Sequence, residues 1–540
     1  MTQTQPAPSA IATHRAAVRG NVAAPQLTHR QTLAILVGVM SGMLLSALDQ
    51  SIVGTALPRI VSDLGGLDHL TWVVTAYLLT STAVTPLWGK ISDLYGRRII
   101  FQIAIVVFLV GSALCGLAQN MPELIAFRAL QGVGGGGLMA IALTIIGDII
   151  PPRERGKYQG YFAAVFGVSS VAGPLLGGFF TDGPGWRWIF YINLPVGAAA
   201  LVITSIALKL PTVRREARID YAGAAVIVAA VSSLLLYLNW AGDARGWTAP
   251  LSVGLVAASL ALTALFILVE SRAAEPIIPL RLFRNAIFRI GNVYTFMSGV
   301  AMFGAIIFLP LYLQGVKGMS PTRSGLAMLP VVTGLFVTSI ASGRLISRTG
   351  RYKIYPILGS SILIVALLLL GTIAVATPYW QVAIYAGVFG LGLGLTLQTV
   401  VVAVQNSVDI RDMGVATSSA TFFRSLGGAI GAATFGAVLG IRLDAHLADR
   451  LGPDGGGAGV DANDIQAMRA LAEPTRHLVL GAFTDSLNDV FLVCVPFIVI
   501  ALAIALMLPE VPLRSGAPPT DDLAKAGAGD PEATLPPVGH

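Results

Sequence analysis

Two ionisable residues of opposite charge lie within long apolar segments of this sequence. Asp49 lies in the segment 32–57 and Arg128 in the segment 122–147. A charged side chain at the centre of a membrane helix costs about 2.5–3.5 kcal/mol, so a residue kept there usually has a partner or a function. At 1.5 Å per residue, both residues lie roughly 9–12 Å below the outer ends of their segments. We therefore expect that Asp49 and Arg128 can neutralise each other.

This pair of residue types can carry out proton chemistry. Burial favours the protonated form of a carboxyl group, whereas a nearby guanidinium favours the carboxylate. A conformational change that alters water access or the distance to Arg128 would therefore change the proton affinity of Asp49. A proton could then be taken up outside and released inside. A structural ion pair that fixes helix packing is the alternative interpretation, and the sequence is compatible with both.

A short polar loop between two apolar segments carries a second group of charges, and its pattern recurs later in the chain. The spacing Gly-x6-Gly-Arg occurs at 89–97 and again at 343–351. Asp93 with Arg97 and Arg98 predicts a salt-bridged latch on the cytoplasmic face. The second copy has Ser347 where Asp93 would be, so we expect the latch to be asymmetric. The gating residues predicted here are Gly89, Asp93, Gly96, Arg97 and Arg98.

Glycine and proline are concentrated in two of the apolar segments. Small residues let helices approach closely, and a Pro in a membrane helix permits a bend. The segment 122–147 contains a run of glycines that is preceded by no strand, so helix packing is favoured over a phosphate-binding loop. The segment 157–180 holds a more specific series: Gly167, Gly173, Pro174, Gly177 and Gly178.

The composition of the chain indicates which kind of element holds these residues in place. The chain has 540 residues, of which 55% are hydrophobic and only 12% are charged, about half the charged fraction of an ordinary soluble protein. The apolar runs have the length of roughly 20 residues that spans a bilayer. The predicted fold class is an all-α membrane protein with fourteen transmembrane helices, at 32–57, 70–89, 97–119, 122–147, 157–180, 186–208, 219–240, 251–271, 286–314, 324–346, 352–373, 378–406, 413–440 and 487–508.

The distribution of basic residues predicts the orientation. Roughly two thirds of the 35 Lys and Arg residues fall on the face that holds both termini, which indicates that both termini are cytoplasmic. The parallel repeat predicts two six-helix bundles, at 31–210 and 276–510, with a two-helix linker at 211–275. We expect disordered cytoplasmic tails at 1–30 and 511–540. The long external loop at 441–486 is either a surface insertion or a docking element.

Four of these motifs, in this order, resemble the major facilitator superfamily in its fourteen-helix drug:H⁺ antiporter branch. The matching stretches are 48–58 in the first helix, 89–98 in the loop, Arg128-x2-Gln131-Gly132 in the fourth helix and the Gly/Pro series in the fifth. The resemblance implies that Asp49 is the proton-linked acid, that Arg128 assists proton transfer and that Asp93 is the gating aspartate. It also implies that the fifth-helix series belongs to an exporter. Ser51 and Gly54 depart from the commonest pattern, which has Thr and Asn there.

Several function classes are not supported by the sequence. Nucleic-acid binding is not expected, because the basic residues sit in short clusters between apolar runs. No P-loop and no His, Cys, Asp or Glu cluster is found, so we expect no enzyme, no cofactor and no metal site. Cys115 and Cys494 lie inside apolar runs and are interpreted as packing residues.

The predicted function is proton-coupled efflux of small amphipathic compounds across the cell (inner) membrane by alternating access. A dedicated exporter of one lipid, siderophore or antibiotic is the alternative. The expected partners are the lipid bilayer, the substrate and protons, with a monomeric protein; whether an accessory outer partner takes part is left open. Arg424 would neutralise a cavity or bind an anionic group. Candidate cavity residues, each also compatible with ordinary helix–helix hydrogen bonding, are Tyr77, Asn292, Tyr294, Gln398, Gln405 and Arg424.

Overall fold

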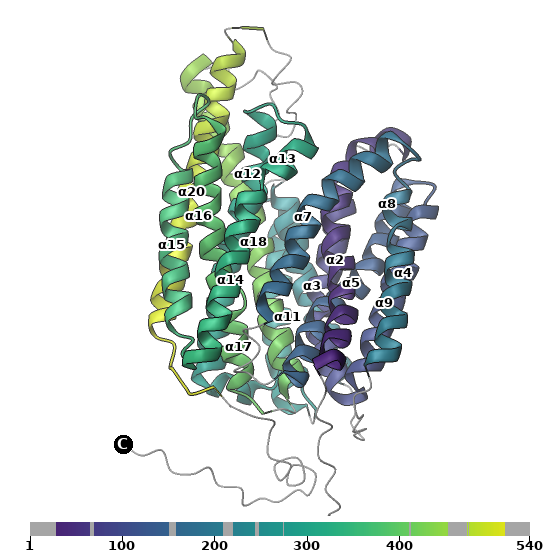
Figure 1. Cartoon of the computed structure of the whole chain (residues 1–540). Coiled ribbons are helices and arrows are strands. Elements are labelled where there is room, and N and C mark those ends of the chain that lie inside the picture. Colours follow the sequence, from purple (N-terminus) through teal and green to yellow (C-terminus); the bar gives the residue numbers. More distant parts are fainter. Residues whose placement is uncertain are drawn as a thin grey trace, which may run out of the picture.

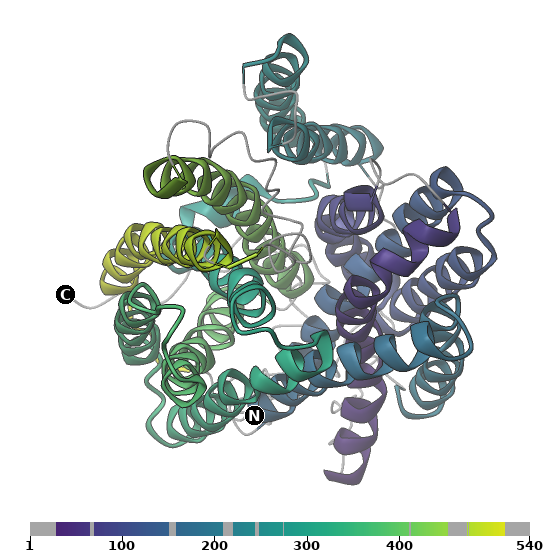
Figure 2. The ribbon, with the colours of Figure 1, turned by 90° about the horizontal axis from the view of Figure 1, so that it is seen from above.

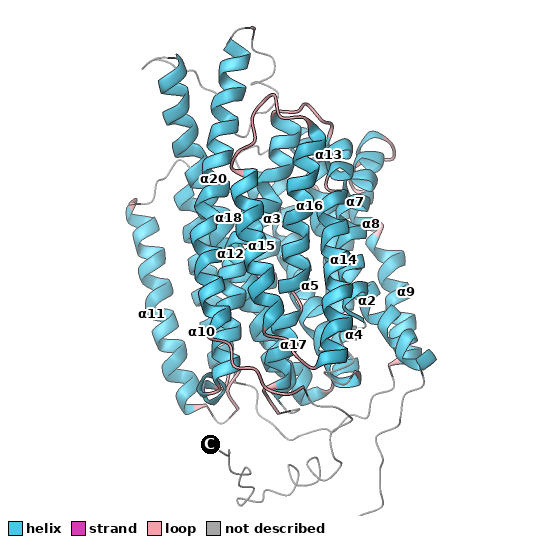
Figure 3. Cartoon of the chain, turned by 60° about the vertical axis from the view of Figure 1, so that its left-hand side comes forward, coloured by secondary structure: helices cyan, strands magenta, loops and turns pink. Residues whose placement is uncertain are grey.

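The protein folds as a bundle of long, roughly parallel and antiparallel helices (Figure 1). The computed structural model describes residues 29–64, 70–150, 158–208, 220–242, 248–273, 275–409, 412–451, 472–473 and 475–513. Within these ranges every regular element is a helix and none is a strand (Figure 3). This agrees with the predicted all-α class. The start of α2 and the end of the described chain lie at the same end of the bundle, the lower end in Figure 1, which is called the terminal end below.

The first half of the chain forms one set of packed helices. Its buried apolar residues form two clusters of their own, one of which is built around Trp186 and Phe190. The helices are α2 (His29–Leu64), α3 (Leu70–Tyr95), α4 (Arg97–Leu117), α5 (Met121–Ile149), α7 (Gln159–Asp182), α8 (Trp188–Tyr191) and α9 (Asn193–Ala207).

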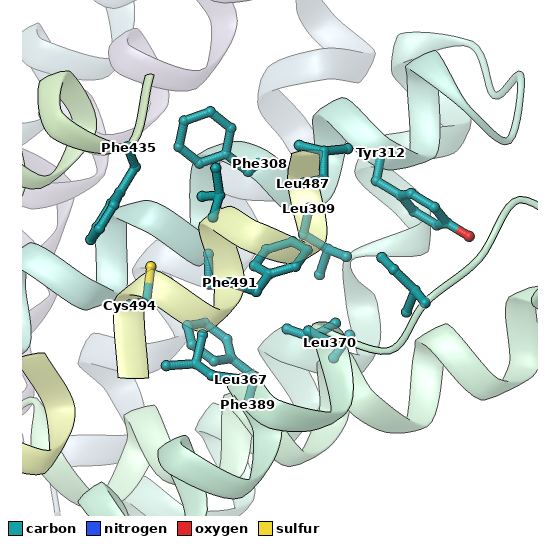
Figure 4. Packing of buried hydrophobic residues seen from close by; sticks show 14 of the residues in the cluster. Phe308, Leu309, Tyr312, Leu367, Leu370, Phe389, Phe435, Leu487, Phe491 and Cys494 are labelled. Atoms are coloured by element: carbon teal, nitrogen blue, oxygen red, sulfur yellow. The ribbon is translucent and has the colours of Figure 1, made fainter. Parts of the chain in front are cut away.

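The second half forms another set, whose largest apolar cluster draws only on residues from 300 onward. Phe308, Phe389, Phe435 and Phe491 fill its centre with Cys494 beside them (Figure 4). The elements are η3 (Leu280–Arg284), α12 (Ala286–Gly315), α13 (Pro321–Ala327), α14 (Leu329–Thr349), α15 (Ile354–Leu370), α16 (Tyr379–Thr396), α17 (Thr399–Asn406), α18 (Met413–Leu451) and α20 (Thr475–Leu506).

Two further helices join the halves. They are α10 (Tyr221–Gly242) and α11 (Pro250–Arg272), close to the predicted bounds of the linker pair. Helix α10 packs against both halves, because Ile227 and Val231 share an apolar cluster with Ala83 of α3 and Phe422 of α18. Helix α11 lies at the periphery, and the pair forms one edge of the molecule in the view from above (Figure 2). Leu260 of α11 is 68% exposed, as expected for a lipid-facing side chain.

The predicted count of fourteen spans is only partly reproduced. Among the described residues, 11 helical stretches are long and apolar enough to cross a membrane, and Ile354–Leu370 is a shorter apolar helix. Three of the 11 stretches, Trp188–Ala207, Thr322–Thr349 and Tyr379–Asn406, each contain a short break in the helix: between α8 and α9, between α13 and α14, and between α16 and α17. Apolar composition does not mark these breaks, because the sequence stays apolar across each one.

The predicted external loop at 441–486 is wrong at both ends. Helix α18 continues to Leu451 and α20 already begins at Thr475, while residues 452–471 and 474 lie outside the described ranges. Leu443 and Leu447 extend the apolar core along this helix pair with Val479 and Phe483 of α20.

Ion pairs cross the same helical extension. Arg442 Nε lies 2.9 Å from Asp489 Oδ2 and His446 Nε2 lies 3.0 Å from the same oxygen, and Arg450 pairs with Asp485. Within the described residues of this region, these charged side chains therefore belong to two paired helices, which project beyond the bundle at its upper end (Figure 1).

Candidate functional site

Asp49 and Arg128 form a fully buried ion pair. Arg128 Nη1 lies 2.6 Å from Asp49 Oδ2, and the two side chains are 1% and 0% exposed. Arg128 also donates from Nε to the carbonyl oxygen of Val73 at 3.0 Å and from Nη1 to Gln131 Oε1 at 2.7 Å. A buried ion pair is tolerated only when its remaining polar atoms are also satisfied, and here three acceptors surround the guanidinium. The contact predicted from helix depth is therefore present.

The other oxygen of Asp49 is held by two amides. Oδ1 accepts from Gln131 Nε2 at 2.8 Å and from Asn193 Nδ2 at 3.2 Å. Asn193 in turn donates to Ser112 Oγ at 3.0 Å. Asp49 thus accepts three hydrogen bonds from side chains of α5 and α9. The carboxylate of Asp49 therefore connects α2 to both α5 and α9.

An aromatic ring covers the guanidinium. The Arg128 Cζ lies 4.4 Å from the centre of the Tyr77 ring, and the Tyr77 hydroxyl is 2.9 Å from Ser46 Oγ of α2. Glycines make this approach possible, since a Cβ at Gly135 would lie 2.9 Å from Tyr77 Cζ and one at Gly132 would lie 3.0 Å from Tyr77 Cα. The glycine run of α5 therefore serves helix packing. It brings α3 close enough to stack on the cation.

Asp93 joins the two halves at the terminal end. Its carboxylate oxygens accept the backbone N–H groups of Gly414 at 3.1 Å and Val415 at 3.0 Å. Both residues lie in the first turn of α18, where unpaired N–H groups and the helix dipole favour an anion. Arg97 pairs with Asp93 and, through Nε, with Asp148 Oδ2 at 2.7 Å. The predicted latch is thus an acid on one half bound to the start of a helix on the other.

The remaining residues of this loop have different contacts. Arg98 donates to the carbonyl oxygen of Ser205 at 2.8 Å, within the first half, and Gly96 has a φ of 95°, which favours glycine. In the second copy of the motif, the hydroxyl of Ser347 donates to Gly343 of its own helix at 2.9 Å. Lys90 reaches Glu275, in the segment before η3, at 2.6 Å.

Close contact across the latch requires Gly89, which gives a first prediction. A Cβ there would lie 2.5 Å from Ser418 Cβ and 2.8 Å from the carbonyl oxygen of Gly414. Overpacking of this kind costs about 1–3 kcal/mol, so we expect Gly89→Ala to separate the terminal ends of α3 and α18. Distance measurements between spin labels on these two ends would report the separation.

Gly436→Ala is the matched control, because nothing lies within 4 Å of a Cβ at that position of α18. Unchanged label distances in Gly89→Ala would contradict the role given to this contact.

The Gly/Pro series lies on α7, where it faces helices of both halves. A Cβ at Gly173 would lie 2.6 Å from Ser51 Cβ of α2, and the hydroxyl of Ser51 donates to the carbonyl oxygen of Ser169 at 2.8 Å. Gly167 faces Val332 of α14, and a Cβ at Gly178 would lie 3.7 Å from Thr322 Oγ1 of α13. Pro174 sits inside the continuous helix. Small residues on α7 thus let it pack on its own half and on the other half at once.

The six candidate cavity residues make contacts in different parts of the molecule. Tyr77 belongs to the Asp49 network. The Tyr294 hydroxyl pairs with Ser360 Oγ at 3.0 Å, and Asn292 Nδ2 donates to the carbonyl oxygen of Phe288 at 2.8 Å. Gln405 donates to Thr417 Oγ1 at 2.9 Å and to Leu143 of α5 at 3.4 Å, between the halves. Gln398, at the start of α17, and Arg424 are half-buried.

Asn193 and Ser112 are members of the Asp49 network that sequence reasoning missed. Asn193 is the first residue of α9, just past the break after α8. In the sequence, Asn193 is a single amide side chain within an apolar run. That feature alone does not predict a contact with Asp49 unless the position of the helix break is also known. Among the described residues, no group of three His, Cys, Asp or Glu side chains could hold a metal ion.

Comparisons of the sequence and the structure with known proteins all find membrane transporters. Residues 39–432 match the model of the Major Facilitator Superfamily. An uncharacterized MFS-type transporter of Mycobacterium tuberculosis is 41% identical over 532 residues, which is 98% of this chain and 76% of the relative. The multidrug transporter protein MdtP of Bacillus subtilis is 41% identical over 419 residues, 78% of this chain and 77% of that protein. The structure of the proton:xylose symporter XylE superposes with a TM-score of 0.57 at 14% identity, covering 90% of this chain and 97% of XylE.

Proposed function

The chain belongs to the major facilitator superfamily, and we propose that it exchanges protons for small amphipathic compounds, such as drugs, dyes or antibiotics, across the cytoplasmic membrane. The observation that carries this proposal is the buried Asp49–Arg128 pair, a titratable acid held at membrane depth by three hydrogen bonds. The name of MdtP as a multidrug transporter supports export and the breadth of substrates.

In this proposal the terminal end is the cytoplasmic face, since Lys and Arg concentrate there. The chain then crosses the membrane fourteen times as a monomer with both termini in the cytoplasm. The Asp93 contact with α18 closes the cytoplasmic side, so the described state is open toward the outside or occluded. Release of this contact lets the two halves rock against each other and expose the substrate to the cytoplasm.

Proton coupling follows from competition at Asp49. In the closed network the carboxylate is paired with Arg128. When the halves rearrange and water reaches Asp49, a proton replaces the guanidinium as its partner, and restoration of the pair expels that proton on the other side. One proton entering supplies about 1.4 kcal/mol per pH unit. It adds about 2.3 kcal/mol per 100 mV when net charge moves.

The test uses proteoliposomes that contain the full chain and a fluorescent cationic dye, ethidium, as the probe. We expect an imposed pH gradient to drive ethidium against its concentration gradient, and a proton ionophore to abolish this. Ethidium movement that is unaffected by the ionophore would contradict the proposal. A strain that lacks the protein and becomes sensitive to a single compound class would favour a dedicated exporter over a broad one.

A further inference from the structure

Arg424 lies at mid-depth in the second half of the chain, on α18. Among the described residues, no side chain or carbonyl group forms a hydrogen bond or an ion pair with its guanidinium. It lies eleven residues after Met413, the first residue of α18, which corresponds to about 16 Å along the helix and so to the middle of a hydrocarbon core roughly 30 Å thick. Arg128, in the first half, is bound by three acceptors instead.

The position on α18 shows which way this residue faces. Phe423 and Ile430 pack in the cluster that contains α10, and Gly427 faces Phe296 of α12. Thr417 lies two helical turns before Arg424 and therefore on the same face of the helix. Through Gln405, Thr417 contacts Leu143 of α5. Arg424 thus lies on the face of α18 that is directed at the interface between the two halves.

Within the described part of the chain, no acidic side chain is paired with Arg424 at this depth. Helices α3, α10 and α12 carry no acidic residue in their central parts. Asp49 is occupied by Arg128, Gln131 and Asn193, and Asp93 and Asp148 at the terminal end pair with Arg97. A guanidinium stays charged even when it is buried, and it carries five N–H donors that require acceptors.

We propose that Arg424 binds the acidic group of the exported compound, so that the substrates of this transporter include amphipathic acids. Carboxylate, sulfonate and phosphate groups match the two parallel N–H donors of a guanidinium. The inference rests on the proposed export function, and it specifies the chemical class of part of the cargo. In this scheme Asp49 carries the proton and Arg424 binds the acidic group of the substrate.

The experiment compares two probes of nearly the same shape, dansylglycine and its amide, which differ by one negative charge. Fluorescence titration of the purified full-length protein measures binding of each. We expect the wild type to bind the acid about tenfold more tightly than the amide, the effect of one charge-assisted hydrogen-bonding pair. Arg424→Gln should lower the affinity for the acid to that of the amide, and Arg424→Lys should retain part of the preference. Arg344→Gln, which removes an exposed Arg on α14, should behave like the wild type.

A structural role for Arg424 gives a different result. Removal of this half-buried, unpaired charge should leave the melting temperature of Arg424→Gln unchanged or raise it, whereas replacement of an Arg with a structural role would lower it. The proposal is overturned if the wild type binds the acid and the amide with equal affinity. It is also overturned if Arg424→Gln lowers the affinity for both probes equally. Suppression of the acid preference by millimolar chloride would identify chloride as the occupant and would also overturn it.

The same variants separate this inference from the proposed function. We expect the control variant Arg344→Gln to retain pH-driven transport of ethidium, which carries no acidic group. If the wild type fails to transport ethidium, the export proposal fails while the comparison of the two dansyl probes still decides the role of Arg424.

Discussion

Replacement of Asp49 by Asn is expected to reduce pH-driven efflux to the level of empty vesicles while the protein still exchanges substrate across the membrane. Asn has nearly the shape of Asp and still accepts a hydrogen bond from Arg128, but it can neither bind nor release a proton. Exchange of labelled for unlabelled ethidium involves no net proton movement, so it should persist. Parallel assays of pH-driven efflux and of exchange in the same proteoliposomes provide the measurement.

Stability must be controlled in this experiment, because Asp49→Asn leaves a buried guanidinium without its counter-charge. Loss of one partner of a buried ion pair costs about 3–5 kcal/mol. The double variant Asp49→Asn/Arg128→Gln removes both charges, so its melting temperature should recover relative to the single variant. If the pair only fixes helix packing, efflux should recover with it. We expect stability to recover and coupling to remain absent.

Gly173→Ala is expected to have the second-largest effect. The new Cβ would lie 2.6 Å from Ser51 Cβ and 3.0 Å from its carbonyl carbon, so α7 and α2 must separate. Because α7 also packs on α14 of the other half, this separation should disturb the interface along which the halves move. A destabilisation of about 1–3 kcal/mol and a loss of most of the efflux should appear in thermal melting and in the vesicle assay.

Gly178→Ala is the control within the same motif, since its nearest atom, Thr322 Oγ1, lies at an ordinary 3.7 Å. It should have near wild-type efflux. Ser51→Gly removes the two nearest atoms of the clash, so Ser51→Gly/Gly173→Ala should recover part of the activity. Equal effects of Gly173→Ala and Gly178→Ala would show that the contact with Ser51 is not what this glycine provides.

Helix positions could largely be predicted from the sequence, because a membrane helix requires a continuous apolar run. The bounds of α4, α5, α10 and α12 differ from the predicted spans by at most a few residues. The projecting ends of α18 and α20 could not be predicted in this way. Their helical structure depends on pairing with each other, through residues such as Leu447 and Phe483, and not on contact with lipid.

The candidate site likewise contains contacts that could be predicted from the sequence and contacts that could not. The Asp49–Arg128 contact followed from the cost of burying charge and from matching depths in two helices. The contribution of Asn193 did not, because it depends on a break in an apolar run that brings the start of α9 to Asp49. Asp93 was expected to pair with Arg97 and Arg98, but its contacts with the N–H groups of Gly414 and Val415 join residues more than three hundred positions apart. No local pattern encodes such a contact.

The most direct test of the central claim measures protons. Proteoliposomes that contain ethidium and a trapped pH-sensitive dye are diluted into buffer that lacks ethidium, with no imposed pH gradient. Downhill ethidium movement through the wild type should drive protons in the opposite direction, whereas ethidium movement through Asp49→Asn should leave the internal pH unchanged. Proton movement of equal size in the two proteins would contradict the assignment of Asp49 as the proton carrier.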